Sequence, residues 1–201
     1  MVSQGGGEVE YVDLGLPSGI LWAVGNLVKD SQGNYAIGAE TDWGIYVSWG
    51  NIDGHNKRED YNFSATNYNT TPGYSVSANI PSSDAAHDIC FARLGTPWHL
   101  PTKENFQELY DNTDNEWTTI NRVVGCKFMK KNDHSIYVFF PASGRYVNTS
   151  NDYHSKNGFY WSSSFYSATH AYRMGFNSST VGPQNNNYRR YGLTVRAVCT
   201  K

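Results

Sequence analysis

The chain has 201 residues, which suits one domain with a single core, and a formal net charge of -2. This charge offers no general attraction to a phosphate backbone or an acidic membrane, so we expect no nucleic-acid partner and no membrane insertion. Aromatic residues make up 15% and charged residues 17% of the sequence. That profile is typical of an extracellular or virion-borne β-rich domain.

The N-terminal part of the chain divides into a leader and the start of a domain. Residues 1–10 lack the charged and apolar regions of a secretory signal and are predicted to be a flexible leader, so residues 11–201 form the single domain. From Tyr11, apolar residues alternate around a Pro-Ser-Gly turn, which predicts a hairpin of two strands. A short strand is expected within residues 42–50. Residues 51–81 are poor in aliphatic side chains and predict a long irregular loop.

Two helices are predicted in the middle of the chain. Ser82 or Ser83 is a candidate N-cap for a helix that runs to about Leu94 and stops at Gly95. The second helix begins after Thr102 and ends near residue 112, with Glu104 at the positive end of its dipole and an apolar stripe along one side.

Strands are predicted over residues 123–125, 135–142, 171–177 and 193–198. In the third of these, alternation places Tyr172, Met174 and Phe176 toward the core and the residues between them toward a partner. The order of strands, two helices and further strands favours an α+β fold with small antiparallel sheets and long irregular loops.

The last quarter of the chain has the composition of a recognition surface. Tyr, Ser, Asn, Gly and Arg crowd residues 158–192, and Lys, Asp and Glu are absent from residues 157–200. Tyr and Arg supply contact area with few rotors to freeze, while Ser, Asn and Gly supply adaptable hydrogen bonds. Ordinary solvated surface is rich in Lys and Glu instead.

Five motifs in order resemble the gut-bacterial major-paralogous-domain family. They are Tyr11-Val-Asp-Leu-Gly-Leu-Pro-Ser-Gly, Trp98-His-Leu-Pro-Thr-Lys-Glu-Asn-Phe-Gln-Glu-Leu, Phe139-Phe-Pro-Ala-Ser-Gly-Arg, Tyr160-Trp-Ser-Ser-Ser and Tyr191-Gly-Leu-Thr-Val-Arg-Ala-Val. The resemblance covers nearly the whole chain from Tyr11. It implies a C-type-lectin-like fold, and some members of the family are variable proteins of diversity-generating retroelements.

In such variable proteins, template adenines are randomised. An Asn codon that ends in a pyrimidine can therefore become a codon for any residue that a pyrimidine-ending codon encodes, and we call these residues the pyrimidine-ending set. Lys, Glu, Gln, Met and Trp lie outside that set, so Trp161, Met174 and Gln184 would be fixed framework. The resemblance implies a ligand-binding surface of thirteen residues that belong to the set. They are Phe159, Phe165, Tyr166, Thr169, His170, Arg173, Gly175, Asn177, Gly182, Asn187, Tyr188, Arg190 and Tyr191.

Several kinds of chemistry are not supported by the sequence. The Glu-Pro-Asn or Gln-Pro-Asp loop of calcium-dependent lectins is absent, and no metal site or cofactor is predicted. A structural calcium ion at Asp53, Glu59 and Asp60 stays open, with a solvated charge run as the alternative.

Formylglycine-generating oxidases share the fold that the resemblance implies, and they carry a redox-active cysteine pair near the C-terminus. This chain has Cys199 alone in that region. Its three cysteines are expected to be buried free thiols.

The expected function is therefore binding without catalysis. The chain is predicted to be an extracellular display protein on a bacterial surface or a phage virion, monomeric, whose diversified surface of residues 158–192 binds a protein or glycan target. A fixed adhesin or carbohydrate-binding domain of the same fold is the alternative, and an oxidase the less favoured one. Exchanging Tyr166, Arg173, Arg190 or Tyr191 should change stability by only about 0.5 kcal/mol.

Overall fold

The computed structural model describes residues 2–4, 7–9, 11–57, 61–63 and 72–200. Strands account for 44% of the protein and helices for 10%. The prediction of an α+β, C-type-lectin-like fold is therefore wrong in class, because the protein is mostly β. Segments rich in Thr and Asn, which read as connections, form long hairpin strands against apolar partners, since strand formation depends on cross-strand packing more than on intrinsic propensity.

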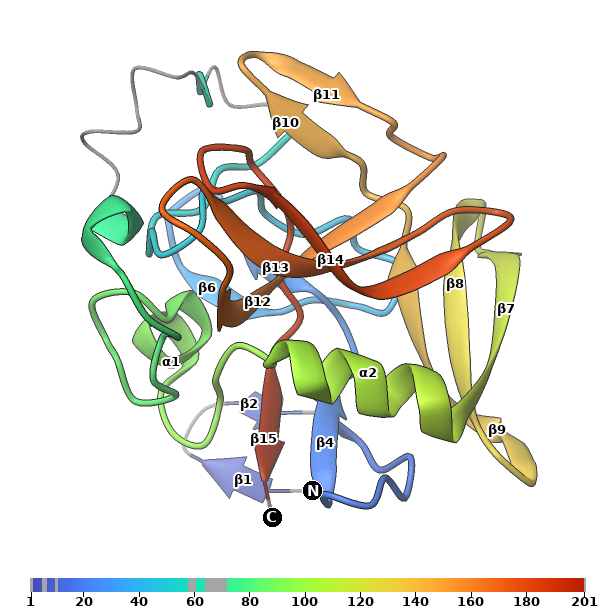
Figure 1. Cartoon of the computed structure of the whole chain (residues 1–201). Coiled ribbons are helices and arrows are strands. Elements are labelled where there is room, and N and C mark those ends of the chain that lie inside the picture. The colour runs from blue at the N-terminus through green and yellow to red at the C-terminus, as the bar shows by residue number, and fades with distance from the viewer. Residues whose placement is uncertain (1, 5–6, 10, 58–60, 64–71, 201) are drawn as a thin grey trace.

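A three-stranded antiparallel sheet crosses the middle of the molecule (Figure 1). It has the order β12 (Gly158–Phe165), β13 (His170–Phe176) and β14 (Val181–Tyr188). As predicted, Met174 and Phe176 of β13 point into a core cluster. Phe159 and Trp161 of β12 belong to the other main cluster, so apolar residues pack on both faces of this sheet.

Two further three-stranded antiparallel sheets flank it (Figure 1). One is formed by β7 (Thr113–Ile120), β8 (Val123–Lys130) and β9 (Asp133–Pro141). The other has the order β15 (Val198–Thr200), β4 (Ile20–Ala23) and β3 (Tyr11–Val12). The pairing of β3 with β4 confirms the hairpin predicted from the alternation that starts at Tyr11.

Three two-stranded antiparallel ribbons complete the strands of the described residues. They are β1 (Val2–Gln4) with β2 (Gly7–Val9), β5 (Leu27–Lys29) with β6 (Tyr35–Ile37), and β10 (Arg145–Val147) with β11 (Ser150–Asp152). The first ribbon lies in the segment predicted to be a flexible leader, of which residues 1, 5–6 and 10 lie outside the described residues.

Several predicted connections and strands need correction. Within residues 42–50, Tyr46 and Val47 form only isolated bridges, to His55 and Leu193. The long connection predicted over residues 51–81 is irregular where it is described, apart from a 3-10 helix, η2 (Pro72–Ser75), and residues 58–60 and 64–71 lie outside the described part. The strand predicted over residues 193–198 is reduced to bridges that lead into β15.

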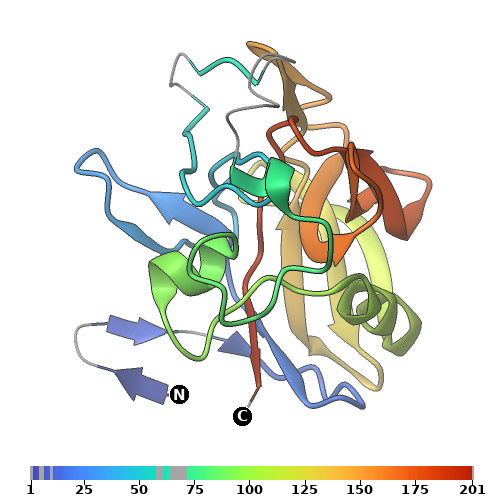
Figure 2. The ribbon, with the colours of Figure 1, turned by 60° about the vertical axis from the view of Figure 1, so that its left-hand side comes forward.

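Helix α2 (Lys103–Asn112) confirms the second predicted helix because its signals are local. Thr102 accepts a hydrogen bond from the Asn105 backbone N–H, and the Asn105 side chain accepts one from Thr102 N, which together form a capping box. Phe106 and Leu109 are fully buried and hold α2 against the β12–β13–β14 sheet. Figure 2 shows α2 and this sheet on one side of the molecule, with β5 and β6 on the other.

Helix α1 (Ile89–Leu94) starts later than predicted, because its N-cap is Asp88 and not Ser82 or Ser83. The Asp88 carboxylate accepts hydrogen bonds from Phe91 N at 3.1 Å and from Leu100 N at 2.9 Å. Only the second contact joins the helix to the segment that leads into α2. Gly95 ends the helix with φ +73°, as predicted from the sequence.

The buried position of Asp88 predicts an unusual pH dependence. Burial raises the pKa of Asp88 to about 7, although backbone N–H groups oppose the shift. Because the folded-state pKa lies above the unfolded value, the stability that this group contributes is present below about pH 4 and is lost as the pH rises through 7. Between pH 5 and pH 8 the wild type should therefore lose more unfolding free energy than Asp88→Asn in urea denaturation. Equal losses in the two proteins would contradict this assignment.

Candidate ligand-binding surface

The backbone under the predicted surface is held by a buried arginine, Arg189, which follows β14. Its guanidinium group donates to three backbone carbonyls, those of His170 at 3.2 Å, Val76 at 2.8 Å and Ser167. The group also lies 4.5 Å from the ring centre of Trp49. Arg189 thus fixes the connection between β12 and β13 and the start of the C-terminal segment in one arrangement.

A row of aromatic side chains lies over this support. Tyr166 contacts Tyr172 edge-on, with ring centres 5.1 Å apart, and lies 6.3 Å from His170. His170 lies 4.1 Å from Tyr188, because these residues are register partners in β13 and β14. Tyr188 in turn lies 5.4 Å from Tyr191. We call these five residues the aromatic row.

Cations interleave with the aromatic row. The Arg190 guanidinium lies 4.4 Å from the Tyr188 ring centre and 5.0 Å from that of Tyr191. Burial, together with the charges of Arg190 and Arg189, lowers the pKa of His170. The neutral imidazole is therefore favoured at neutral pH, where it can both donate and accept a hydrogen bond.

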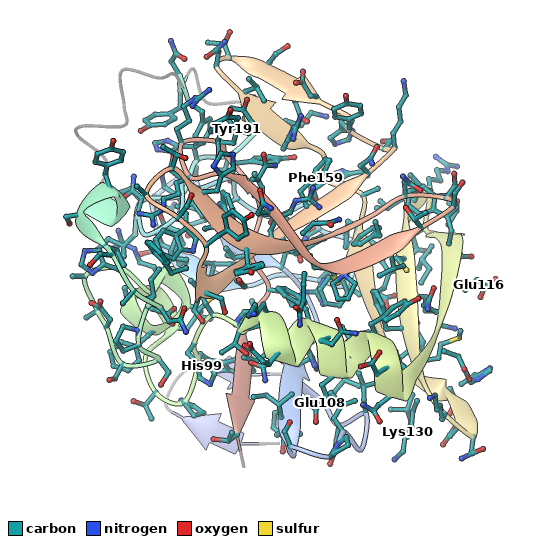
Figure 3. All side chains as sticks on the ribbon, in the orientation of Figure 1. His99, Glu108, Glu116, Lys130, Phe159 and Tyr191 are labelled. Atoms are coloured by element: carbon teal, nitrogen blue, oxygen red, sulfur yellow. The ribbon has the colours of Figure 1, made fainter. Side chains whose placement is uncertain are left out.

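A second arginine cluster continues from the end of the row. The Arg145 guanidinium lies 5.2 Å from the ring centres of both Tyr191 and Phe159, and 5.4 Å from that of Tyr153. Arg173 reaches the Phe159 ring from β13, at 4.7 Å. We call Arg145 and Arg173 the arginine pair. Figure 3 shows Phe159 and Tyr191 near each other, beside β10 and β11 and on the far side of the central sheet from α2.

The thirteen predicted residues differ in how far they reach the surface. Tyr166, Thr169 and Tyr188 are exposed; Phe159, Gly175 and Asn187 are buried. The other seven are intermediate, namely Phe165, His170, Arg173, Asn177, Gly182, Arg190 and Tyr191. The predicted surface thus includes residues that support it from below.

Most of these residues meet around the aromatic row and the arginine pair. Thr169 Oγ1 lies 2.8 Å from His170 Nδ1, and Phe165 packs against Arg189. Gly175 has no side chain, and any Cβ atom at this position would collide with the Arg173 guanidinium. Gly175 pairs with Gly182 across β13 and β14.

Asn177 lies apart from the row. It caps the turn at the other end of the β13–β14 hairpin, where its side chain accepts from Ser179 N and Thr180 N. This turn lines a separate hollow of about 400 Å³ beside Trp117.

Arg145, Tyr153 and Tyr172 also belong to the site and were not predicted. Arg145 is the last residue of the Phe-Phe-Pro-Ala-Ser-Gly-Arg motif quoted above, so the resemblance carried a signal for it. Tyr172 was assigned to the core face of β13, and it lies on that face of the strand but is only half-buried. Lys103 at the start of α2 covers it, with its Nζ 4.6 Å from the ring centre.

The described residues contain no group of three or more His, Cys, Asp or Glu side chains that could hold a metal ion. Of the acidic residues considered for calcium, Asp53 forms an ion pair with Arg93 at 2.7 Å. Glu59 and Asp60 lie outside the described residues. Among the helices of the described part, none has the length and apolar character of a membrane span.

The three cysteines are buried and free, as predicted. Burial raises the pKa of Cys126 to about 12 and that of Cys199 to about 11, and it also raises the pKa of Cys90. A redox-active cysteine requires the opposite, an accessible thiol with a lowered pKa.

Comparison with known protein families matches part of the chain. Residues 110–198 are similar to a family described as a domain of unknown function, DUF8237. The matched segment runs from the end of α2 to the start of β15 and contains all thirteen predicted residues together with Arg145. No curated protein and no solved structure shows significant similarity to the chain.

Proposed function

We propose that the protein is a ligand- or receptor-binding display protein that carries out no chemical step. The observation that carries the proposal is the aromatic row with the interleaved Arg190, which residues from the connection after β12, from β13, from β14 and from the following segment build together. Large aromatic and guanidinium groups of this kind dominate binding energies at protein interfaces. The proposed site of action is a bacterial surface or a phage virion. The target is therefore a protein or a glycan presented outside the cell.

The buried residues that hold the backbone are distinct from the side chains of the aromatic row, and this division favours binding over the alternative functions. Arg189 and Trp161 have their polar atoms bonded to backbone carbonyls, so the framework does not depend on which side chains occupy the row. The high thiol pKa values weigh against the oxidase alternative. The resemblance to retroelement variable proteins supports a surface that is diversified rather than fixed.

A binding measurement tests the proposed surface. The wild type is applied to an array of glycans and to a panel of purified bacterial surface proteins, and each hit is measured again with the triple variant Tyr166→Ala, Tyr188→Ala, Arg190→Ala. Binding should fall at least tenfold in this variant. Tyr110→Ala on α2 is the matched control, because Tyr110 is 38% exposed and Tyr188 is 39% exposed. Hits that bind the triple variant as well as the wild type would contradict the proposal.

The same positions should tolerate exchange without loss of folding. Tyr166→Ser and Tyr188→Ser are each expected to change the free energy of unfolding by about 0.5 kcal/mol, because both side chains are exposed. Urea denaturation followed by circular dichroism measures this. A loss of several kcal/mol at either position would show that the row is part of the core.

Diversification has a genomic test. We expect a near-identical template repeat beside a reverse transcriptase gene, with adenine-containing codons opposite Tyr166, Thr169, Tyr188 and Arg190. The codon of the framework residue Trp161 should match between the template and the gene. A genome without such a repeat would leave a fixed binding domain as the function and would reject diversification.

A further inference from the structure

The arginine pair consists of two neighbouring cations without a counter-ion among the described residues. Both guanidinium groups lie against the Phe159 ring. Burial, and then the charge of Arg145, lowers the pKa of Arg173 to about 10. Asp152 is the register partner of Arg145 in β11, yet the two form no ion pair. Two like charges are thus held together at a cost in free energy.

The same cluster holds hydrogen-bond donors that have no acceptor. Five buried side-chain polar atoms of the described residues lack a partner, and three of them are Arg145 Nε, Arg173 Nε and Asn187 Nδ2. Arg145 Nη1 donates to Asn187 Oδ1 at 3.3 Å, which orients the Asn187 amide so that its NH₂ group is the unpaired end. All three unpaired atoms are N–H donors. A group that complements them must bring acceptors.

The other buried arginines show that this fold satisfies guanidinium groups when they are structural. Arg196 donates to Asn26 Oδ1 and to the carbonyls of Ala23, Val24 and Phe139. Arg189 likewise donates to three carbonyls. Arg173, in contrast, donates no side-chain hydrogen bond within the described part of the chain. The pair is therefore an exception that packing alone does not explain.

We propose that the arginine pair binds a carboxylate group of the ligand, with the Asn187 amide as an additional donor. This inference rests on the proposed function and names the chemistry at one end of its surface. A guanidinium fork matches the two oxygens of a carboxylate, and the planar Phe159 and Tyr191 rings beside it keep water from the ion pair. Both arginines are half-buried rather than enclosed, so part of each side chain is open to solvent, although the unpaired Nε atoms lie beneath the surface.

The single charge of a carboxylate suits this site better than a phosphate dianion does. The pair offers two cations and one amide, without a helix N-terminus or a series of backbone N–H groups. The Asp152 carboxylate on the neighbouring strand opposes a second negative charge. The carboxylate can come from an acidic side chain of a protein or from a sugar acid.

The test follows the arginine Nε–H signals of the ¹⁵N-labelled protein by NMR during titration with sodium acetate. The signals of Arg145 and Arg173 should move along one saturable isotherm, while those of Arg189 and Arg196 stay in place. Sodium chloride at the same ionic strength should produce no saturable shift. If chloride and acetate act alike, or if inorganic phosphate binds more tightly than acetate, the proposal is overturned.

Variants and larger probes sharpen the assignment. Arg145→Met and Arg173→Met should each weaken acetate binding at least tenfold, whereas Arg190→Met, a cation of the same surface, should change it less than twofold. Glucuronate and N-acetylglutamic acid amide separate the two sources of the carboxylate. Tighter binding of either one than acetate identifies the source, and equal binding identifies a site for the carboxylate alone. If Arg190→Met lost as much acetate binding as Arg145→Met and Arg173→Met, acetate would be responding to general surface charge. That result would reject the site.

Thermal unfolding gives a readout that does not depend on the ligand's identity. Acetate should raise the midpoint of the wild type but not that of Arg173→Met, and Arg173→Met without acetate should melt no lower than the wild type. A lower midpoint in that variant would show a structural role for Arg173.

If acetate does not bind but the triple variant still loses its target, only the carboxylate site fails. If acetate binds and no target depends on the aromatic row, the proposed function fails alone.

Discussion

Arg196→Met is expected to lower the free energy of unfolding by about 3–5 kcal/mol. The Arg196 side chain is fully buried, and its guanidinium group bonds Asn26 Oδ1 at 2.9 Å and three backbone carbonyls. Methionine fills much of the volume but leaves those acceptors buried and unpaired. The bonds join the end of β4 and the residues after it to Phe139 of β9, so their loss should loosen the packing between these two segments.

Guanidinium chloride denaturation at pH 7, followed by tryptophan fluorescence, measures this effect. Arg190→Met provides the matched control, because the same exchange at a half-buried surface position should cost about 1 kcal/mol or less. A loss below about 1 kcal/mol for Arg196→Met would mean that water replaces the guanidinium group and that the framework does not depend on it.

Trp161→Ala is the second large effect, with an expected loss of about 3–5 kcal/mol. The Trp161 side chain is 1% exposed and packs in the core cluster on the side of the central sheet away from α2. Its Nε1 donates to Val47 O at 2.8 Å, and its backbone N–H bonds Thr194 O at 3.1 Å. The exchange therefore creates a cavity and removes the side-chain bond that ties β12 to Val47, whereas the backbone bond to Thr194 is kept.

Two further variants check the Trp161 prediction in the same denaturation experiment. Tyr166→Ala lies just after the end of β12 with a half-exposed ring, so it should cost about 0.5 kcal/mol. Trp161→Phe keeps part of the packing and should lie between the two. Similar losses for Trp161→Ala and Tyr166→Ala would contradict the division between a buried framework and a displayed row.

Local signals in the sequence were sufficient for some elements. Helix α2 was predicted with its observed start because the Thr102 cap and Glu104 in the first turn are adjacent signals in the sequence. The β3–β4 hairpin was predicted from alternation around a turn. The core face of β13 was also found, because its alternation places Met174 and Phe176 on one side.

Elements that depend on distant partners were missed or misplaced. The segments that form β7 and β14 are rich in Thr and Asn, and they become strands because β8 and β13 pair with them. The start of α1 depends on Asp88, whose carboxylate also accepts a hydrogen bond from the backbone N–H of Leu100, twelve residues away. These missed strands are the reason that the α+β class was wrong.

The site shows the same division. Composition alone singled out the segment that carries Tyr166, Tyr188 and Arg190, because a run without Lys, Asp and Glu is visible in the sequence. Which of its residues lie at the surface could not be read from it, since Phe159 and Asn187 turn inward while Tyr166 turns outward.

The sequence by itself determined the residues whose cause lies within a few positions, namely caps, turns, alternation and the aromatic composition of the C-terminal segment. Only the tertiary structure decided that Arg145 joins Arg173, 28 positions further along the chain, on one phenylalanine ring. The physical reason is that burial and the loss of counter-ions depend on which segments pack together. Those contacts are long-range, and no local pattern in the chain encodes them.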